Sequence, residues 1–390
     1  MDEIVIAAIG QTPVGEHWEL SLRDLAQHAY ESLRADSGDL PASLRPEALY
    51  VGNMLAPQLS NQAHSGALLA DHLGLKNIEA AAVEAGGASG GAALRLGYLA
   101  VASGQVDSVL VMGIEKLTDR IGPKVESALS TQTDSDYEAV QGMTPLTQAA
   151  LLMRRYQHDF DLPHSVFAGF AVTAHANGAH NPNAMFRSPV SVEAYEKAPL
   201  VSDPLNLFDV APGADGAAAV LLTRKERMPA DWPHPLVRLA ASSMANDRLA
   251  LHDRPDLLDL SAVRISTAKA CQQAGIAPGE MDLIELYDAY SILTALSLEA
   301  IGLAERGQGW KLAQDGKIGL SGLAPIATFG GLKARGNPGG ATGIYQVVEA
   351  VLQLRGEAGD NQVPGAQRAL AQCLGGMAAT AVTHILEKME

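Results

Sequence analysis

Alternating strand-like and helix-like stretches fill the first third of the chain. Residues 4–9 form a short apolar run, and 22–35 repeat apolar residues at the spacing of a helix. A second strand is predicted over 48–55 and a second helix over 64–75. A strand that runs through glycines into a helix ending near Gly104 follows, and then a further strand over 108–114. This alternation predicts a largely parallel sheet, buried between helices that cover both of its faces.

The pattern changes between about residue 115 and residue 204. Polar turns and separate helical stretches, such as 147–156, replace the strand-helix alternation there. A segment of this length without strands is usually functional in an α/β protein. The strand pattern returns at 216–223.

The strand-helix order then begins a second time. A strand is predicted over 236–242, a helix over 260–274, a strand leading into the helix after Ser291, and two strands near the end of the chain. Glycine turns open a helix in both parts, at 86–104 and at 336–356. Two such units predict an internal duplication with a lid inserted in its first half.

We therefore predict three parts. The N-terminal half comprises 1–118 and 205–228, the lid comprises 119–204, and the C-terminal half comprises 229–390.

Composition and charge restrict the class of protein. Hydrophobic residues make up 47% of the 390 residues and charged residues 18%, which fits a soluble protein with large cores. A net charge of -16 argues against a nucleic-acid partner, which requires a basic face. The two cysteines cannot form a disulfide framework, and no stretch approaches the roughly 18 apolar residues of a membrane span. We expect a cytoplasmic protein.

Several segments resemble one family when they are taken in their order along the chain. They are VEAGGASGGAALRLGYLAVASG, NLFDVAPGADGAAAV, ALHDR, YDAYS, GGLKARGNPGGATG and QCLGG. Together they are similar to the thiolase superfamily, in particular to its archaeal and sterol-carrier-protein types, which include acetyl-CoA acetyltransferases. The resemblance covers essentially the whole chain.

The resemblance implies a fold, a ligand and partners. The implied α/β fold is the thiolase fold, two duplicated βαβαβαββ halves in a five-layer αβαβα arrangement, usually dimeric. The ligand would be a coenzyme A thioester, with no permanently bound cofactor. A small partner protein with an OB-fold and a zinc ribbon is also implied as possible.

Gly87 is the first departure from the family pattern. It stands where a thiolase has its nucleophilic cysteine, at a helix N-terminus that would lower the pKa of a thiol. Glycine keeps the amide N–H of an oxyanion hole but has no side chain, so no acyl-cysteine can form at this position. Ser89 lies nearby, and we assign it to substrate binding because a serine nucleophile needs an adjacent base.

Asn337 and Tyr287 are the other departures. Asn337 replaces the histidine of the family's GHP motif; it can donate a hydrogen bond but cannot accept a proton near neutral pH. Tyr287 replaces an oxyanion-hole histidine or asparagine, and a phenol can donate to an oxyanion. Asp288 is a possible partner of Tyr287, so all three are predicted to be catalytic.

Cys373 is retained in the segment QCLGG. In the family, the cysteine of this motif removes a proton from the α-carbon of the second acyl group, so Cys373 is predicted to be catalytic. The amide N–H of Gly375 would form part of an oxyanion hole. The alternative for Cys373 is a buried structural thiol.

Three further residues are predicted to bind substrate. Tyr290 ends the YDAYS motif, Tyr345 lies one turn into the helix after GGATG, and His252 falls in a segment that matches the family's substrate channel. Core packing is the alternative for both tyrosines. The histidines of the inserted region have no metal-site spacing, and the GGxxG stretches lack the residues of a nucleotide loop.

Three functions remain open from the sequence. The first is carbon–carbon bond formation or cleavage on an acyl-CoA without an acyl-enzyme, as in aldol or retro-aldol chemistry with Tyr287 and Cys373. The second is an acyltransferase in which Cys373 has become the nucleophile. The third is a non-catalytic CoA-binding or scaffold subunit.

Overall fold

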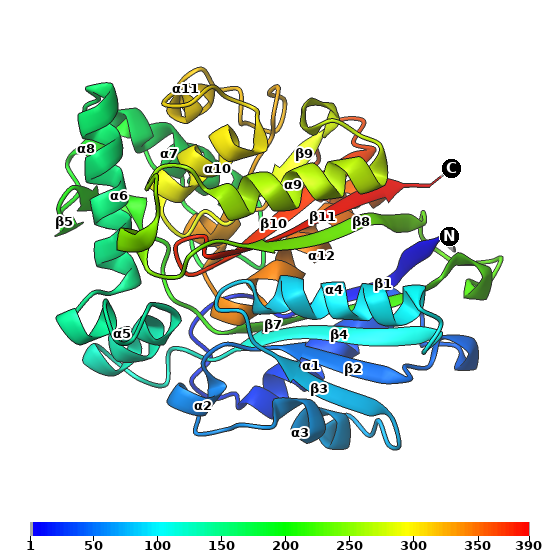
Figure 1. The fold of residues 1–390 in the computed structure, drawn as a ribbon. Coiled ribbons are helices and arrows are strands. Elements are labelled where there is room, and N and C mark those ends of the chain that lie inside the picture. The colour runs from blue at the N-terminus through cyan, green and yellow to red at the C-terminus, as the bar shows by residue number, and fades with distance from the viewer. Residues whose placement is uncertain (1–2, 390) are drawn as a thin grey trace.

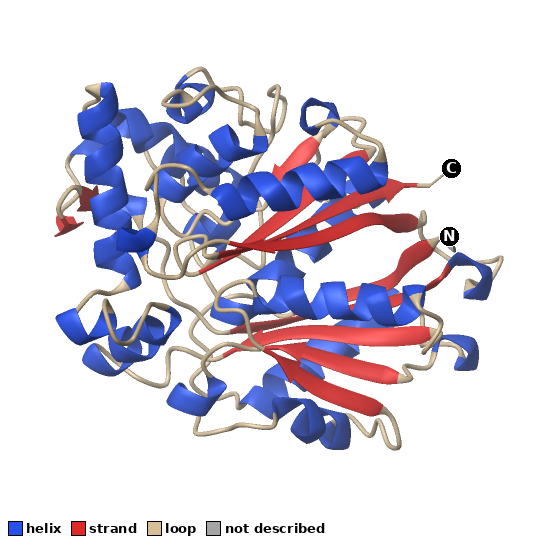
Figure 2. Cartoon of the chain, viewed as in Figure 1, coloured by secondary structure: helices blue, strands red, loops and turns tan. Residues whose placement is uncertain are grey.

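The computed structural model describes residues 3–389 and contains a nine-stranded mixed sheet with helices on both faces (Figures 1 and 2). The order across the sheet is β3-β2-β4-β7-β1-β8-β11-β10-β9, and β5 and β6 form a separate pair. The strands are β1 Ile4–Gln11, β2 Ala48–Gly52, β3 Glu79–Val83, β4 Ser108–Glu115, β5 Leu200–Ser202, β6 Leu205–Asn206, β7 Gly216–Arg224, β8 Val237–Asn246, β9 Leu283–Glu285, β10 Arg368–Gly375 and β11 Thr380–Lys388.

The helices occupy the segments between these strands. They are α1 Leu22–Asp36, α2 Ala56–Leu59, α3 Ser65–His72, α4 Ser89–Ala102, α5 Pro123–Leu129, α6 Pro145–Phe160, α7 Ala168–Gly178, α8 Val192–Glu196, α9 Ser261–Ala274, α10 Ser291–Ile301, α11 Gly309–Gln314 and α12 Thr342–Arg355. No helix in 3–389 is long and apolar enough to cross a membrane.

The large sheet consists of two halves with the same strand order. Read from its outer edge, the first half is β3-β2-β4-β7-β1, and the second half is β9-β10-β11-β8. From β2 inward, the pairs of β2-β4-β7-β1 are parallel, antiparallel and antiparallel, and the pairs of β9-β10-β11-β8 follow the same sequence. Strand β9 thus corresponds to β2. The position that β3 occupies beside β2 is taken, beside β9, by a single parallel bridge between Ile284 and Ile326. The predicted duplication is therefore confirmed. The prediction of a largely parallel sheet is wrong, because β1, β7, β8 and β11 all pair antiparallel with their neighbours.

The chain forms five layers, as predicted from the family resemblance. Helices α1 and α3 cover the outer face of the first half-sheet, and α9 and α10 cover the outer face of the second (Figure 1). Helices α4 and α12 lie in the middle layer and contact each other as well as both half-sheets. Three hydrophobic cores separate these layers, so each half-sheet is buried on both faces.

Glycines allow the two middle helices to approach each other near their N-termini. A Cβ atom on Gly343 would lie 2.9 Å from the Cα atom of Gly91 and closer still to its amide nitrogen. A Cβ atom on Gly90 would lie 2.9 Å from the carbonyl oxygen of Gly340. Both predicted glycine-turn units are therefore brought together, with the first turns of α4 and α12 side by side.

The parallel strands of both halves end at the same side of the molecule. At this side Glu115, the last residue of β4, fixes two turns: its carboxylate accepts hydrogen bonds from the amide N–H groups of Met54, Leu55 and Gly340 at 2.8 to 3.1 Å. The segment between β4 and β7 also begins here, and its helices α5 to α8 lie at the left in Figure 1. Ligands of open α/β sheets bind at these carboxyl ends.

Element boundaries differ from the predictions at a few positions. The strand predicted over 48–55 ends at Gly52, because Asn53 starts the turn that Glu115 holds. The helix predicted over 147–156 starts at Pro145, where the Thr144 hydroxyl accepts from the amide of Thr147. The strand pair β5–β6 was not predicted, because each of its strands is only two or three residues long.

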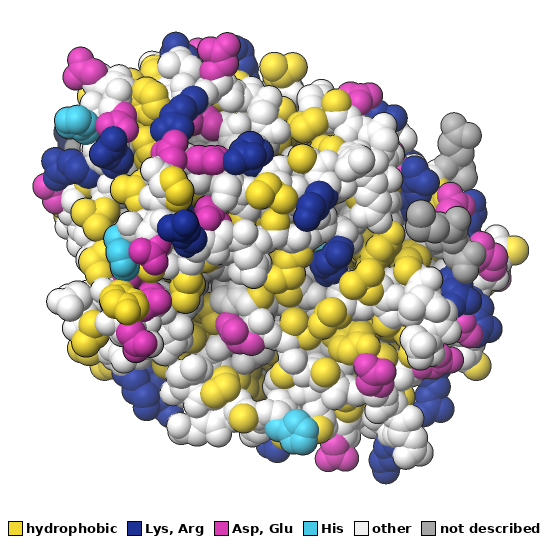
Figure 3. All heavy atoms as spheres, viewed as in Figure 1, with side chains coloured by type: hydrophobic (Ala, Val, Ile, Leu, Met, Phe, Trp, Pro, Cys, Tyr) yellow, Lys and Arg dark blue, Asp and Glu magenta, His cyan; other side chains and the backbone are white. Residues whose placement is uncertain are grey.

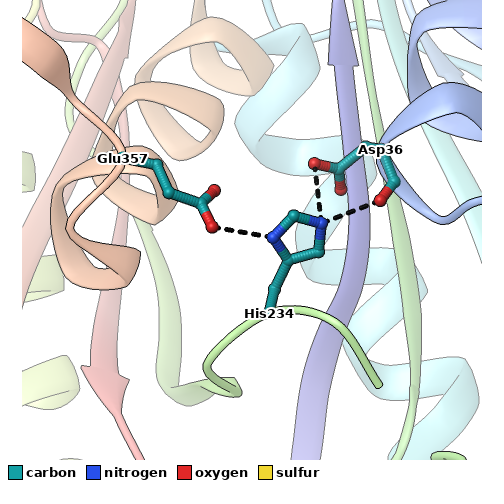
Figure 4. A group of neighbouring side chains, drawn as sticks. All are labelled: Asp36, His234 and Glu357. Atoms are coloured by element: carbon teal, nitrogen blue, oxygen red, sulfur yellow. Dashed lines mark hydrogen bonds and ion pairs between the residues drawn. The ribbon is translucent and has the colours of Figure 1, made fainter. Parts of the chain in front are cut away.

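A histidine joins the two halves at the opposite side. His234, in the connection before β8, places Nδ1 2.7 Å from Glu357 Oε1 and Nε2 2.8 Å from the carbonyl oxygen of Asp36 (Figure 4). Both partners are oxygen atoms that accept hydrogen bonds. Both ring nitrogens are thus engaged by the protein, and Arg355 pairs with the Asp36 carboxylate. This cluster therefore links α1 to the end of α12.

The buried His384 makes stability depend on pH. It lies on β11 with Nε2 3.1 Å from the carbonyl oxygen of Gly91, and burial lowers its pKa from 6.5 to about 4. The folded state thus favours the neutral ring, so the stabilisation is complete above pH 6.5 and is lost as the pH falls through 4. The difference corresponds to about 3 kcal/mol.

We expect urea unfolding of His384→Gln to show a smaller loss of stability between pH 6.5 and 4 than the unmodified protein shows. His28→Gln, which changes an exposed histidine, is the control. Equal pH dependence of all three proteins would contradict this role of His384.

Candidate active site

A cavity of about 160 Å³ lies where the carboxyl ends of the parallel strands meet the inserted helices. It receives residues that follow β2, β4, β9 and β10 and residues from α5, α6 and the loop before β7. Its lining residues are Met54, Leu117, Val125, Glu126, Leu129, Gln132, Pro145, Leu146, Val210, Ala211, Gly213, Tyr287, Ala289, Tyr290, Asn337, Gly339, Gly376 and Met377. Three of the predicted site residues, Tyr287, Tyr290 and Asn337, are among them.

The Tyr287 side chain occupies the space above Gly87. A Cβ atom on Gly87 would lie 2.8 Å from Cζ of Tyr287, closer still to its hydroxyl oxygen, and 2.7 Å from the carbonyl oxygen of Leu374. These distances are shorter than ordinary van der Waals contacts, so the position accepts no side chain without movement of its neighbours. In this structure, the absence of a side chain at Gly87 and the position of the Tyr287 side chain therefore depend on each other.

The Tyr287 hydroxyl is in its neutral form. Burial raises the pKa of Tyr287 above its ordinary value, and the neighbouring Cys373 and Tyr290 raise it further. A hydrogen bond with the Asn337 side chain acts in the opposite direction. The phenol is consequently a hydrogen-bond donor at neutral pH, not a base.

Asn337 is held with its amide group available to the cavity. Its Oδ1 atom accepts from the amide N–H of Gly339 at 3.1 Å and from the Thr342 hydroxyl at 3.3 Å. Its main chain is fixed by bonds to Pro212 and Ala214. With Oδ1 engaged by two donors, the NH₂ group is the part of the side chain that can donate to Tyr287 or to a ligand.

Cys373 lies behind Tyr287 and outside the cavity lining. Its side chain is 1% exposed, and the thiol donates to the carbonyl oxygen of Gly87 at 3.1 Å. Burial raises its pKa to about 12. The thiol is therefore protonated at neutral pH and bound to the main chain of the glycine turn.

Two helix N-termini and a glycine turn surround the Tyr287 hydroxyl. The first turn of α4 follows Gly87, and the first turn of α12 follows Asn337. A helix N-terminus carries partial positive charge, which favours an anionic oxygen. Gly375 packs against the Ala85 carbonyl group, whereas Gly376 lines the cavity and donates its amide N–H to Gln132 Oε1 at 3.2 Å.

The Asp288 carboxylate is hydrogen-bonded to the main chain and not to Tyr287. Its carboxylate accepts from the amide N–H of Leu332 at 2.7 Å and of Lys333 at 3.3 Å, while burial raises its pKa. It therefore shapes the wide helical turn Gly331–Arg335, which leads directly to Asn337.

Tyr290 and Glu126 line the cavity from two different parts of the chain. Tyr290 precedes α10, where its main chain bridges Val210, and Glu126 lies on α5. Burial raises the pKa of the Tyr290 phenol, and the charge of Glu126 raises it further. Within the described residues, Glu126 is the one carboxylate that lines the cavity.

Three predicted substrate-binding residues lie elsewhere. The Ser89 hydroxyl donates to the carbonyl oxygen of Gly86 at 2.6 Å and accepts from the amide of Ala85, so it closes the glycine turn. Tyr345 is fully buried, with its hydroxyl bonded to Thr12 and Ala217. His252 is exposed, 3.6 Å from Asp253.

The inserted segment supplies cavity residues that the motifs did not indicate. Glu126 and Gln132 belong to a segment with no recognisable motif, and Gly376 adjoins the predicted Gly375. The signal that could have found the first two is the break in the strand-helix pattern after β4, because it places a non-sheet segment at the carboxyl end of the sheet.

The comparisons with known proteins agree with this architecture. The domain described as "Thiolase, N-terminal domain" matches residues 4–226, and "Thiolase C-terminal domain-like" matches 243–388. The chain belongs to the thiolase family.

Relatives in this family carry different names. The acetyl-CoA acetyltransferase of Methanothermobacter thermautotrophicus is 40% identical over 388 residues, 100% of each chain. The benzoylsuccinyl-CoA thiolase subunit BbsB of Thauera aromatica is 29% identical and covers 94% of this chain and 91% of its own. A solved structure described as an Ltp2-ChsH2(DUF35) aldolase has a TM-score of 0.84 at 23% identity, covering 99% and 98%, which shows the shared fold.

The contact between Gly87 and Tyr287 predicts the effect of the smallest substitution. We expect Gly87→Ala to lower the free energy of unfolding by about 1–3 kcal/mol, because the added methyl group overpacks the site. Gly279→Ala is the control, since nothing lies within 4 Å of a Cβ atom there. Chemical denaturation measures both variants, and a Gly87→Ala variant as stable as the control would contradict the observed contact.

The burial of Cys373 predicts its reactivity. We expect iodoacetamide at pH 8 to leave Cys373 unmodified in the folded protein and to alkylate it in denaturant, because the thiolate is the reactive form. Peptide mass mapping would locate the modification. Rapid alkylation of Cys373 in the folded protein would show that the thiol is accessible and ionised.

Proposed function

We propose that this thiolase-family protein makes or breaks a carbon–carbon bond on an acyl-CoA thioester without an acyl-cysteine, by aldol or retro-aldol chemistry. The observation that carries the proposal is the position of the Tyr287 hydroxyl, in the space that a side chain on Gly87 would need. A nucleophile has been replaced by a hydrogen-bond donor. The site can therefore stabilise an enolate oxygen but cannot hold a covalent acyl group at position 87.

The thioester oxygen would lie between Tyr287, Asn337 and the first turn of α4. The phenol and the amide NH₂ group each donate one hydrogen bond, and the helix N-terminus adds partial positive charge. These donors are held before the substrate arrives, because Asn337 is fixed by Gly339 and Thr342. Such pre-organised donors stabilise negative charge that develops during the reaction.

The reaction also needs a base, and Glu126 fits this role better than Cys373. The pKa of the Cys373 thiol is about 12, and Tyr287 and Tyr290 are both held neutral. Glu126 is exposed, lines the cavity and has a carboxylate oxygen that can accept a proton. It would act directly, or through the Tyr290 hydroxyl or a water molecule.

Every proton that moves during the cleavage has a donor and an acceptor. Glu126 takes the proton of the β-hydroxyl group, the bond between Cα and Cβ breaks, and its electron pair forms the enolate of the shortened thioester. An aldehyde or ketone leaves. The proton held by Glu126 then returns to Cα, so the carboxylate is restored and no further reactant is consumed. Condensation follows the same steps in reverse.

The other functions have less support. An acyltransferase that uses Cys373 as nucleophile requires a thiolate in contact with the ligand, whereas this thiol is buried and protonated. A non-catalytic CoA-binding subunit leaves unexplained why Tyr287 and Asn337 face a cavity. Some relatives are named acetyl-CoA acetyltransferases, but their name does not account for the loss of the cysteine.

The assembly is also part of this proposal. Strand β3 has one neighbour, β2, and its residues Glu79–Val83 are exposed or half-buried, so a second copy could pair along this edge in a homodimer. A partner with an OB-fold and a zinc ribbon is supported by the aldolase neighbour, whose description includes a DUF35 component. On the face shown in Figure 3, basic side chains are interspersed among acidic ones, which fits small-molecule or protein partners.

Exchange of the α-hydrogens of propionyl-CoA with D₂O tests the enolate step. We expect Tyr287→Phe and Glu126→Gln each to slow this exchange by about 100-fold or more, because one removes the donor and the other the base. Tyr98→Phe, which changes a phenol near the C-terminal end of α4, is the control. This variant should exchange the α-hydrogens of the thioester at the rate of the unmodified protein. Mass spectrometry of the thioester gives the rates.

Absence of exchange in the unmodified protein, together with no cleavage of a set of 3-hydroxyacyl-CoA thioesters, would argue against the function. If Tyr287→Phe exchanges the α-hydrogens as fast as the unmodified protein, the phenol does not stabilise the enolate.

A further inference from the structure

A second cavity, of about 470 Å³, lies beside the loop that precedes α9 and the C-terminal end of α6. Its charged lining residues are Arg155, Arg254, Arg306 and Asp256, and His252 also contributes. Three guanidinium groups and one carboxylate thus meet in one cavity of a protein whose net charge is -16. This local excess of positive charge is opposite in sign to the protein as a whole.

Two of the three arginines are already neutralised. Arg306 forms a bidentate ion pair with Asp256, in which Nη2 lies 3.0 Å from Oδ1 and Nη1 donates to Oδ2. Arg155 places Nε 2.8 Å from Asp159 on the next turn of α6. Both side chains remain more than half exposed, so they can turn toward a ligand without unfolding.

Arg254 is different, because it is 5% exposed and has no carboxylate within ion-pair distance among residues 3–389. Its Nε atom donates to the carbonyl oxygen of Arg248 at 3.1 Å and Nη1 donates to that of Met377 at 2.7 Å. The Nη2 atom is buried and has no partner in the described chain. The carboxylates of Asp247 and Glu138 act on Arg254 from beyond ion-pair distance, so an anion bound here would give the buried guanidinium group a direct partner.

We infer that this cavity is a phosphate-binding site with Arg254 at its base and Arg155 and Arg306 at its rim. A guanidinium group offers a planar pair of donors that matches the oxygens of a phosphate group. A phosphate dianion, unlike a single carboxylate, can balance the unpaired Arg254 and still accept bonds from both rim arginines. The ligand is therefore a phosphate group, either of a nucleotide such as the one in CoA or of free phosphate.

The cavity is connected to the candidate active site through one hydrogen bond. Met377, whose carbonyl oxygen accepts from Arg254, lines the active-site cavity next to Gly376. A phosphate group on Arg254 would therefore fix the loop that carries Gly376. A role of this site in CoA binding rests on the proposed function, because CoA thioesters are its proposed substrates. Binding of free phosphate does not depend on that function.

Isothermal titration calorimetry of the full chain at low salt tests the site. The probes are inorganic phosphate, adenosine 3′,5′-bisphosphate and dephospho-CoA. We expect a phosphate-bearing probe to bind the unmodified protein and its Kd to rise at least about 10-fold in Arg254→Gln, since a charge-assisted pair is worth about 1.5–3 kcal/mol. Arg155→Gln and Arg306→Gln should each weaken binding, which keeps the test valid if Arg254→Gln does not fold.

Arg154→Gln is the matched control, because Arg154 neighbours Arg155 on α6 but points to Asp203 and does not line the cavity. Tight binding of the bisphosphate with weak binding of inorganic phosphate would identify the nucleotide as the source. Comparable binding of inorganic phosphate would identify free phosphate. No binding by any probe, or equal binding by the rim variants and Arg154→Gln, would overturn the inference. Binding that persists in a protein without α-hydrogen exchange would separate the site from the proposed function.

Discussion

The contact between the Tyr287 side chain and the main chain of Gly87 determines what this site can do. The phenol fills the volume in which a side chain on residue 87 would project, and the Leu374 carbonyl oxygen closes the same space from β10. A cysteine at position 87 would need both neighbours to move. The glycine at position 87 and the tyrosine at 287 thus depend on each other sterically, and the proposed chemistry uses a neutral hydroxyl donor instead of a thiolate.

The surrounding scaffold is arranged to keep that donor in place. The carboxyl ends of β4, β9 and β10 meet the N-termini of α4 and α12, and buried polar groups connect them. Glu115 holds the turn before α12, Asp288 holds the turn before Asn337, and Cys373 holds the carbonyl group of Gly87. Cys373, predicted to be catalytic, and Ser89, predicted to bind substrate, here make hydrogen bonds to the main chain around the site.

The sequence was sufficient to predict most of the fold, because its strand-helix rhythm and its paired glycine turns both have local signatures. It also indicated Gly87, Tyr287 and Asn337, since each departs from a motif. It could not predict which face of α12 carries Tyr345 toward the core, or that Gly376 rather than Gly375 lines the cavity, because these depend on how distant elements pack. Glu126 and Gln132 were not found, because a contact made by an inserted segment leaves no periodic pattern.

The measurement that tests the central claim most directly is the intact mass of the protein after rapid acid quenching of a mixture with acetyl-CoA or acetoacetyl-CoA. A thiolase that works through an acyl-cysteine accumulates an acetylated enzyme under these conditions. The space occupied by Tyr287 and the burial of Cys373 predict an unmodified mass with both thioesters. An acetyl group mapped to Cys373 would contradict the account, because it would show that the buried thiol is the nucleophile.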